Sequence, residues 1–189
     1  MDYIGEHSLI SFLGRASVAL SFAGALATVF FYSLYFFSSS EKKRYNHNGI
    51  KSAGRLSFAF HSIGVLGTIG ILFTALFNHW FEFDYVWRHS SLEMPMKYIA
   101  SCFWEGQEGS FLLWTTWHVI LGWVLVGTAK NWEFGTLMLL AMVQVFLTSM
   151  LLGIYIGDLK IGSSPFILIR ELPENIGLPW TELRDYLIR

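Results

Sequence analysis

Long stretches without Asp, Glu, Lys or Arg alternate with short polar segments along the chain. Four of these apolar stretches stand out, at residues 16–37, 56–80, 110–129 and 134–156. At about 1.5 Å per residue, a helix of 20 residues or more crosses a hydrocarbon core of about 30 Å. The pattern predicts an all-α polytopic membrane protein, a bundle of four transmembrane helices.

Basic residues are distributed unevenly between the polar connections. The connection after the first stretch is the most basic one, and it holds Lys42, Lys43, Arg44, Lys51 and Arg55. The connection after the second stretch is mainly acidic. Because basic loops stay in the cytoplasm, we expect the N-terminus, the 81–109 loop and the C-terminus outside. The predicted organisation is a four-span region over 1–156 and an outer segment over 157–189.

Composition narrows the class of protein. Charged residues make up 14% of the chain and hydrophobic residues 53%, with a mean hydropathy of +0.46. Soluble domains contain about 25% charged residues, so lipid is the expected solvent. The net charge of −1 gives no indication of a nucleic-acid partner. The single cysteine, Cys102, excludes an internal disulfide and a CxxC motif, and no metal site is predicted.

Three polar side chains lie well inside the predicted spans. A membrane b-haem needs two imidazoles at matched depth, and His61 and His118 are the candidates. Counted from the cytoplasmic span edges, they lie roughly 7.5 Å and 16 Å deep, a mismatch of about 9 Å. The sequence therefore favours interhelical hydrogen bonds for these histidines. The same interpretation applies to Gln144, whereas His118 stays on a short list because ionisable groups in membranes are often functional.

The outer loop contains the other candidate chemistry. His79 and His89 flank its aromatic residues and are weaker candidates for contact with haem or a partner. The alternation over 81–85 is compatible with a short extended segment or with an interfacial aromatic belt. Glu105 and Glu108 are spaced as neighbours on one helix face, but no nucleophile is close to them in sequence. No catalytic residue is predicted.

The stretch "FWEGQEGSFLLWTTWH" (103–118) has a structural interpretation. Ser110 is a good N-cap for the third span, and acids before a helix N-terminus are favoured by the macrodipole. Glycines allow a sharp turn into the bilayer. The Trp residues are typical of the membrane interface.

The same residues also resemble a known motif. "WEGQEGSFLLW" is similar to the W-G-x-x-E-G-S-x-L-x-W signature of the CcmF-type haem lyase subunit of cytochrome c maturation. "FEFDYVWRHSS", "SSPF" at 163–166 and the early "IGEHSLI" resemble the family's flanking segments in the same order. Six residues that match the motif are our candidates for orienting haem or a partner: Trp104, Gly106, Glu108, Gly109, Ser110 and Trp114.

The resemblance also has departures. Glu105 and Gln107 occupy motif positions where Gly and His are often seen, so a role for that histidine is not carried over. The family's Trp-rich segment and His-Pro-Pro loop, where its haem-ligating histidines lie, are absent from the sequence. We therefore expect the chain to be the N-terminal portion of a longer protein.

The resemblance implies a function in cytochrome c-type biogenesis. It implies an inner-membrane protein with its main loops and tail on the periplasmic side, which takes part in haem delivery and attachment to apocytochrome c. Haem is then a cofactor of the full-length family, and this portion need not bind it. The implied partners are apocytochrome c, other maturation proteins and membrane lipid. The alternatives are a non-catalytic scaffold or docking subunit and, less favoured, a small b-type cytochrome using His61 and His118.

Overall fold

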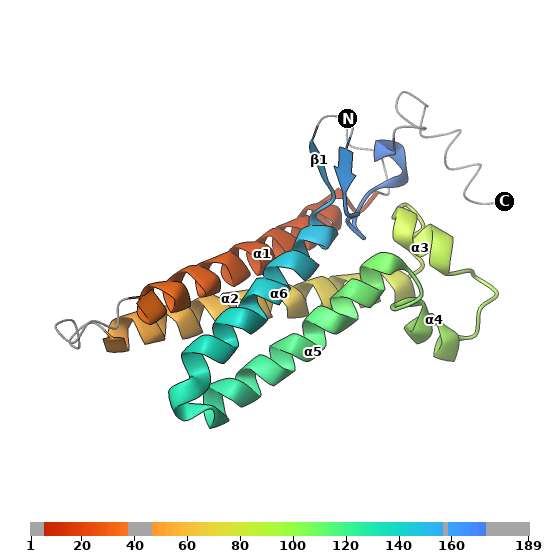
Figure 1. Cartoon of the computed structure of the whole chain (residues 1–189). Coiled ribbons are helices and arrows are strands. Elements are labelled where there is room, and N and C mark those ends of the chain that lie inside the picture. Colours follow the sequence, from red (N-terminus) through yellow and green to blue (C-terminus); the bar gives the residue numbers. More distant parts are fainter. Residues whose placement is uncertain (1–5, 38–46, 157–158, 173–189) are drawn as a thin grey trace.

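A computed structural model describes residues 6–37, 47–156 and 159–172. Its long helices are α1 (Ser8–Phe37), α2 (His47–Phe77), α5 (Gln107–Thr128) and α6 (Glu133–Leu152). Within the described residues these are the four helices long and apolar enough to cross a membrane. The predicted all-α bundle of four spans is therefore confirmed, and the chain is an integral membrane protein (Figure 1).

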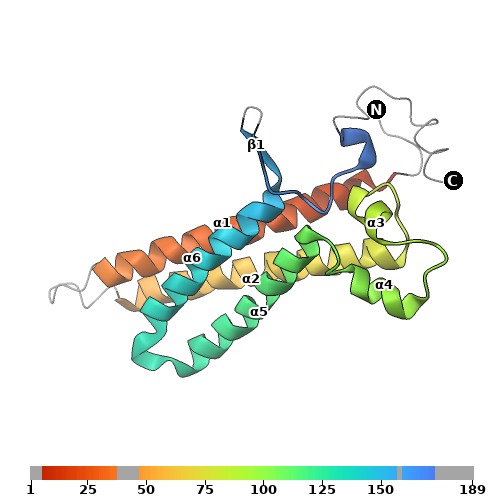
Figure 2. The ribbon, with the colours of Figure 1, turned by 45° about the vertical axis from the view of Figure 1, so that its right-hand side comes forward.

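Each of the four long helices packs against two of the others. Helix α1 lies along both α2 and α6, and α5 lies along α6 and also contacts α2 (Figures 1 and 2). At one end of the bundle, the short helix η2 (Lys130–Trp132) joins α5 to α6. We call this end, which carries Lys51, Arg55 and Lys130, the basic end.

The opposite end carries the smaller elements. These are α3 (Asp84–His89), α4 (Met96–Cys102), the hairpin of β1 (Ile154–Ile156) and β2 (Leu159–Ile161), and η3 (Ile169–Glu171). We call it the motif end, because the segments 81–91, 103–114 and 163–166 lie there (Figure 2).

The first two helices begin earlier than the apolar stretches indicated. Arg15 lies inside α1, and Lys51 and Arg55 lie inside α2. These charges are tolerated within helices because they are paired: Arg15 with Glu171, and both α2 cations with Glu133. The charge-free interval therefore marks only the central part of each helix.

The fourth helix ends earlier than expected, at Leu152 instead of residue 156. Gly153 adopts a left-handed conformation (φ 61°), which ends the helix. The residues that follow form β1 of the hairpin and do not continue the span. Most of the 157–189 segment, including everything from residue 173, lies outside the described residues.

Small residues bring α1 and α2 into backbone contact. A Cβ added at Gly24 would lie 2.5 Å from the backbone nitrogen of His61, and one at Gly64 would lie 2.5 Å from that of Ser21. Without a hydrophobic driving force between helices in lipid, such close packing is a main source of helix association. The His61 ring adds to it, because its Nδ1 lies 2.8 Å from the carbonyl oxygen of Ser21.

Polar side chains connect the other helix pairs. Gln144 of α6 donates from Nε2 to the carbonyl oxygen of Thr115 in α5 at 3.0 Å, which confirms its predicted role between helices. Glu133 of α6 is 1% exposed and accepts two 2.7 Å hydrogen bonds from Arg55. Its second cation is Lys51, at 2.9 Å. This ion cluster joins α6 to α2 at the basic end.

The α1–α2 contact gives a matched pair of glycine substitutions. We expect Gly64→Ala to destabilise the protein by about 1–3 kcal/mol, because its Cβ would force two helix backbones apart. Gly70→Ala, in the same helix, has nothing within 4 Å of the added Cβ. It should be neutral or stabilising by up to about 1 kcal/mol, since Ala favours helix more than Gly. Thermal unfolding in detergent measures both, and equal shifts would contradict this packing.

Candidate functional site

The segments that resemble family motifs are far apart in sequence but meet at the motif end. Phe83 forms a bridge with Leu168, and the Asp84 N–H donates to the Ile167 carbonyl at 3.0 Å. Of the extended segment that the alternation over 81–85 allowed, only Phe83 is extended, because residues 81 and 82 lie in a turn and α3 begins at Asp84. The backbone after the second span is thereby tied to the backbone after the fourth.

The 163–166 segment is also fixed to the start of α1. The Ser11 hydroxyl donates to the carbonyl oxygen of Phe166 at 2.9 Å. The Phe166 ring lies directly on Gly14, where any Cβ would overlap it. The ring of Phe83 packs edge-on against Phe166, with centroids 6.4 Å apart. Phe166 is therefore fully buried at the junction of these segments.

Two ion pairs attach the N-terminal residues to the same place. Glu6 accepts a 2.9 Å hydrogen bond from Arg170, and His7 Nδ1 lies 2.6 Å from Glu82. The His7 ring stacks on Trp80 with centroids 4.1 Å apart. Burial raises the pKa of Glu6 although Arg170 opposes the shift. The early segment, the outer loop and η3 thus form one unit.

Tyr85 anchors the turn that precedes the third span. Its hydroxyl donates to the carbonyl oxygen of Phe103 at 2.9 Å, and the carbonyl oxygen of Cys102 also lies within reach, at 3.1 Å. The same hydroxyl accepts a hydrogen bond from the N–H of Gly106 at 3.3 Å. Burial raises the pKa of the Tyr85 phenol, so the group remains a protonated donor. One buried hydroxyl therefore contacts three backbone groups of the turn, those of Cys102, Phe103 and Gly106.

The two motif glycines are required by close contacts. A Cβ at Gly106 would lie 2.6 Å from the Tyr85 ring and 2.8 Å from Nε2 of His89. A Cβ at Gly109 would overlap the carbonyl oxygen of Phe103. Both positions therefore accept only glycine without movement of their neighbours.

Helix α5 begins earlier than the sequence indicated. Its first residue is Gln107 and its N-cap is Gly106, so the expectation of Ser110 as N-cap was wrong. The Ser110 hydroxyl instead donates to the carbonyl oxygen of Trp104 at 2.9 Å and closes the turn. Glu108 lies in the first helical turn, where its charge complements the macrodipole.

Apart from Glu108, the motif candidates thus divide into two groups. Gly106, Gly109 and Ser110 shape the turn, whereas Trp104 and Trp114 are exposed by 48% and 62%. Glu105 is exposed and precedes the helix, so it does not share a helix face with Glu108. The turn is a rigid support that presents Trp104 and Glu105 on the surface.

The structure changes the argument about His61 and His118. Measured along the helices from the start of α2 and the end of α5, they lie about 21 Å and 15 Å in, so the mismatch reverses and falls to about 6 Å, which weakens the depth argument. Burial does separate them. His61 is fully buried between α1 and α2, as an interior histidine hydrogen-bonded to Ser21, and its Nε2 has no partner among the described residues. A porphyrin would reach it only if those helices parted.

The remaining histidines lie on separate elements. His118 is partly buried on α5 and its Nδ1 lies 2.9 Å from the Trp114 carbonyl, which leaves Nε2 available. His89 stacks on Tyr85 with centroids 4.4 Å apart, and His79 adopts a left-handed φ of 53° after α2. Within the described ranges, no group of three or more His, Cys, Asp or Glu is placed to hold a metal ion.

Sequence reasoning missed Tyr85 and Glu133. Glu133 had one available signal, as the one acid in the short connection between the third and fourth predicted spans. Tyr85 lay within the quoted segment "FEFDYVWRHSS", but its role depends on a contact 18 residues away in sequence, with Phe103, which that segment does not indicate.

These features define a polytopic membrane protein with an ordered, aromatic-rich cap at one end. No protein-family model matches the chain, and no curated protein does. Among solved structures, it is similar to the cytochrome c haem lyase CcmF, with a TM-score of 0.69 at 20% sequence identity. The match covers 88% of this chain and 26% of that one, so the chain spans about a quarter of its length. The fold expected for a CcmF-like N-terminal portion is confirmed.

The Tyr85 contacts predict how the turn responds to loss of one hydroxyl. Cys102 is 1% exposed, its Sγ lies 3.3 Å from Met94 Sδ, and burial raises the pKa of its thiol. We expect little alkylation of Cys102 by a maleimide in the folded protein. Tyr85→Phe removes the donor and leaves buried carbonyls unpaired, a cost of about 1–3 kcal/mol, so labelling should accelerate about ten-fold.

Tyr98→Phe is the matched control, because the Tyr98 side chain is 52% exposed. It should leave the labelling rate unchanged. If Tyr85→Phe and Tyr98→Phe label alike, Tyr85 does not hold the turn.

Proposed function

We propose that the chain acts in cytochrome c biogenesis, as part of a haem lyase-like subunit that helps to deliver haem to apocytochrome c. The observation that carries the proposal is the convergence of the motif-like segments at one end of the bundle. In an up-and-down bundle of four helices these segments share one end by topology alone, so the support comes from the hydrogen bonds that join them. The CcmF-like fold supports the same interpretation.

The proposed role of the motif end is orientation and docking. The buried turn fixes the backbone from Cys102 to Ser110, so Trp104 is presented on a rigid support. An exposed Trp offers a large flat apolar face, which suits either a porphyrin edge or a protein partner. Such preorganisation reduces the entropy lost on binding.

Haem ligation is not assigned to this chain. When bound, haem supplies the vinyl groups that join the cysteine thiols of apocytochrome c. The burial of His61 does not fit an axial ligand, and no contact between His118 and another histidine is seen among the described residues. We propose that this portion positions haem or its partners, while ligands come from elsewhere in the assembly.

The first test is genetic. Deletion of the gene in its own host should abolish covalently attached haem in c-type cytochromes, measured by haem staining of denaturing gels. Complementation with Trp104→Ala should restore at most about a tenth of the wild-type signal. Trp132→Ala is the matched control, since Trp132 is 79% exposed at the opposite end, and it should complement fully.

Co-purification separates the proposal from its alternatives. Recovery of maturation proteins with the wild-type chain and their loss with Trp104→Ala would support docking at the motif end. Normal haem staining in the deletion strain would refute a role in biogenesis. Partners retained without any effect on haem attachment would favour a scaffold. A Soret band on the purified chain that is lost in both His61→Ala and His118→Ala would favour a b-type cytochrome.

The function requires the motif end to face the compartment where haem is attached. We propose that the motif end lies outside and the basic end in the cytoplasm, since Lys51, Arg55 and Lys130 gather at the latter. A membrane-impermeant maleimide added to intact spheroplasts should label Trp104→Cys and not Asn131→Cys. Because native Cys102 is buried, it contributes little background. The reverse pattern would invert the topology and remove the motif end from the site of attachment.

A further inference from the structure

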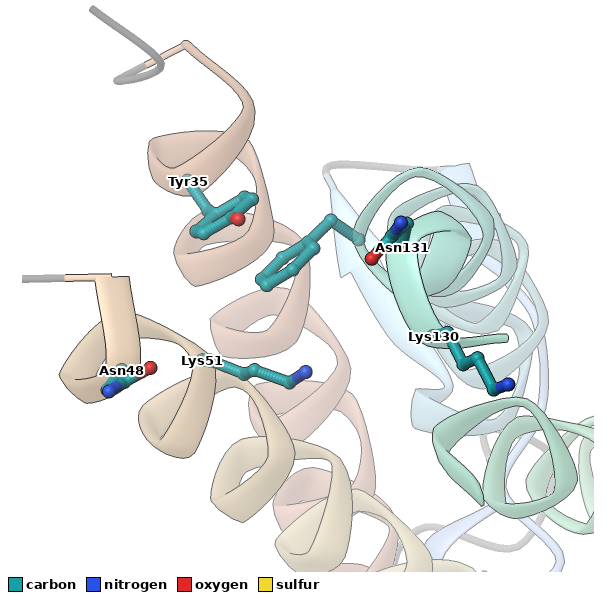
Figure 3. Close-up of a pocket in the computed structure, with 6 residues that line it drawn as sticks. Tyr35, Asn48, Lys51, Lys130 and Asn131 are labelled. Atoms are coloured by element: carbon teal, nitrogen blue, oxygen red, sulfur yellow. The ribbon is translucent and has the colours of Figure 1, made fainter. Parts of the chain in front are cut away.

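A cavity of about 330 Å³ opens at the basic end of the bundle. It lies between the end of α1, the start of α2 and the connection from α5 to α6 (Figure 3). Its lining combines two ammonium groups, two amides and two aromatic rings: Lys51, Lys130, Asn48, Asn131, Tyr35 and Phe134. None of these residues belongs to the motif end, so the cavity is independent of the function proposed above.

The charge around the cavity is positive. Lys51 and Arg55 share one carboxylate, that of Glu133, with Lys51 Nζ at 2.9 Å. Lys130 adds a further cation, and no ion pair with an acid of the described residues is recorded for it. Glu133 is 1% exposed and held by its two partners, so its charge is largely compensated at the cavity surface. An anion would meet ammonium and amide donors there.

The geometry supports a built site. Figure 3 shows Lys51 extending from α2 toward the connection that carries Lys130 and Asn131. Tyr35 and Phe134 stack with ring centroids 3.3 Å apart and form an apolar wall, over which the Lys51 ammonium lies 5.4 Å from the Phe134 centroid. Lys130 adopts a left-handed backbone (φ 43°), unusual for a residue with a side chain.

The position of the cavity indicates the kind of anion. It lies where the apolar helices end, and exposed Trp132 next to it is typical of the membrane interface. The last turns of α1 also expose apolar side chains beside the cavity, on the face about 100° round the helix from Tyr35, with Leu34 at 44% and Phe30 at 58%. A lipid whose phosphate entered the cavity would therefore find an apolar path for its acyl chains. Basic pockets between transmembrane helices bind anionic head groups in this way.

We propose that this cavity binds the phosphate of an anionic phospholipid head group. Lys51 and Lys130 supply the charge, and the amides of Asn48 and Asn131 supply further donors. The lipid would bridge the start of α2 to the α5–α6 connection.

The test measures lipid binding to the purified full chain by native mass spectrometry. Phosphatidylglycerol and phosphatidylcholine with identical acyl chains are titrated separately. The wild-type chain should retain one phosphatidylglycerol in preference to phosphatidylcholine. Lys130→Asn removes the charge and introduces a residue that tolerates the left-handed backbone. It should weaken phosphatidylglycerol binding about five-fold, the factor expected for one basic residue near an anionic head group.

Lys97→Asn is the matched control, because exposed Lys97 lies at the motif end and its loss changes the net charge equally. It should leave phosphatidylglycerol binding unchanged. Asn131→Ala, which removes a lining amide without changing the charge, should weaken phosphatidylglycerol and spare phosphatidylcholine. Equal effects of Lys130→Asn and Lys97→Asn, or equal binding of the two lipids by the wild-type chain, would overturn the proposal.

A competition experiment distinguishes the source of the phosphate. Millimolar inorganic phosphate, compared with chloride at the same ionic strength, should not displace a lipid that is also held by its acyl chains. Displacement of phosphatidylglycerol by inorganic phosphate, and not by chloride, would overturn the lipid assignment and identify a site for free phosphate.

Discussion

The backbone contact between α1 and α2 is the constraint on which the rest of the structure depends. Gly24 and Gly64 remove the side chains that would separate the helices. In a bilayer this is decisive, because lipid tails solvate apolar side chains as well as a neighbouring helix does. Once α1 is fixed against α2, other segments pack against each of its two ends. Gly14 receives Phe166 at one end, and Tyr32 faces Glu133 at the other.

At both ends of the bundle, ion pairs form where the helices leave the hydrocarbon core. Burying an unpaired charge costs several kcal/mol, so charged residues near these ends need partners. Arg15 finds Glu171 and the Phe166 carbonyl, while Lys51 and Arg55 find Glu133. The two ends nevertheless differ. The ion pairs of the motif end each join one cation to one acid, whereas at the basic end two cations share Glu133 beside a cavity that Lys130 also lines.

The reliable part of the sequence analysis was the part governed by the bilayer. A gap of 20 or more residues without charge, as in 16–37, has few structural solutions in lipid, because every backbone group must be hydrogen-bonded within the helix. The central part of each span was therefore predictable. The ends were not, because whether Arg15 or Lys51 can lie inside a helix depends on a partner distant in sequence. The end of α6 at Gly153 was also missed, since a left-handed glycine has no periodic signal.

The motif shows most clearly why the site was only partly predictable. Its residue types were visible, but their division into supports and surface depends on Tyr85, which no motif spacing indicates. The contacts also show the structural surroundings of the two departures from the motif, Glu105 and Gln107. Glu105 stands where the resembling motif often has glycine, but its position is exposed, and the steric need for glycine falls on Gly106. Gln107 stands where that motif often has histidine, and an imidazole nitrogen beside Gly106 comes instead from His89, in a different segment. The shape of this turn therefore depends on Gly106 and Tyr85 and on neither of the two departing residues.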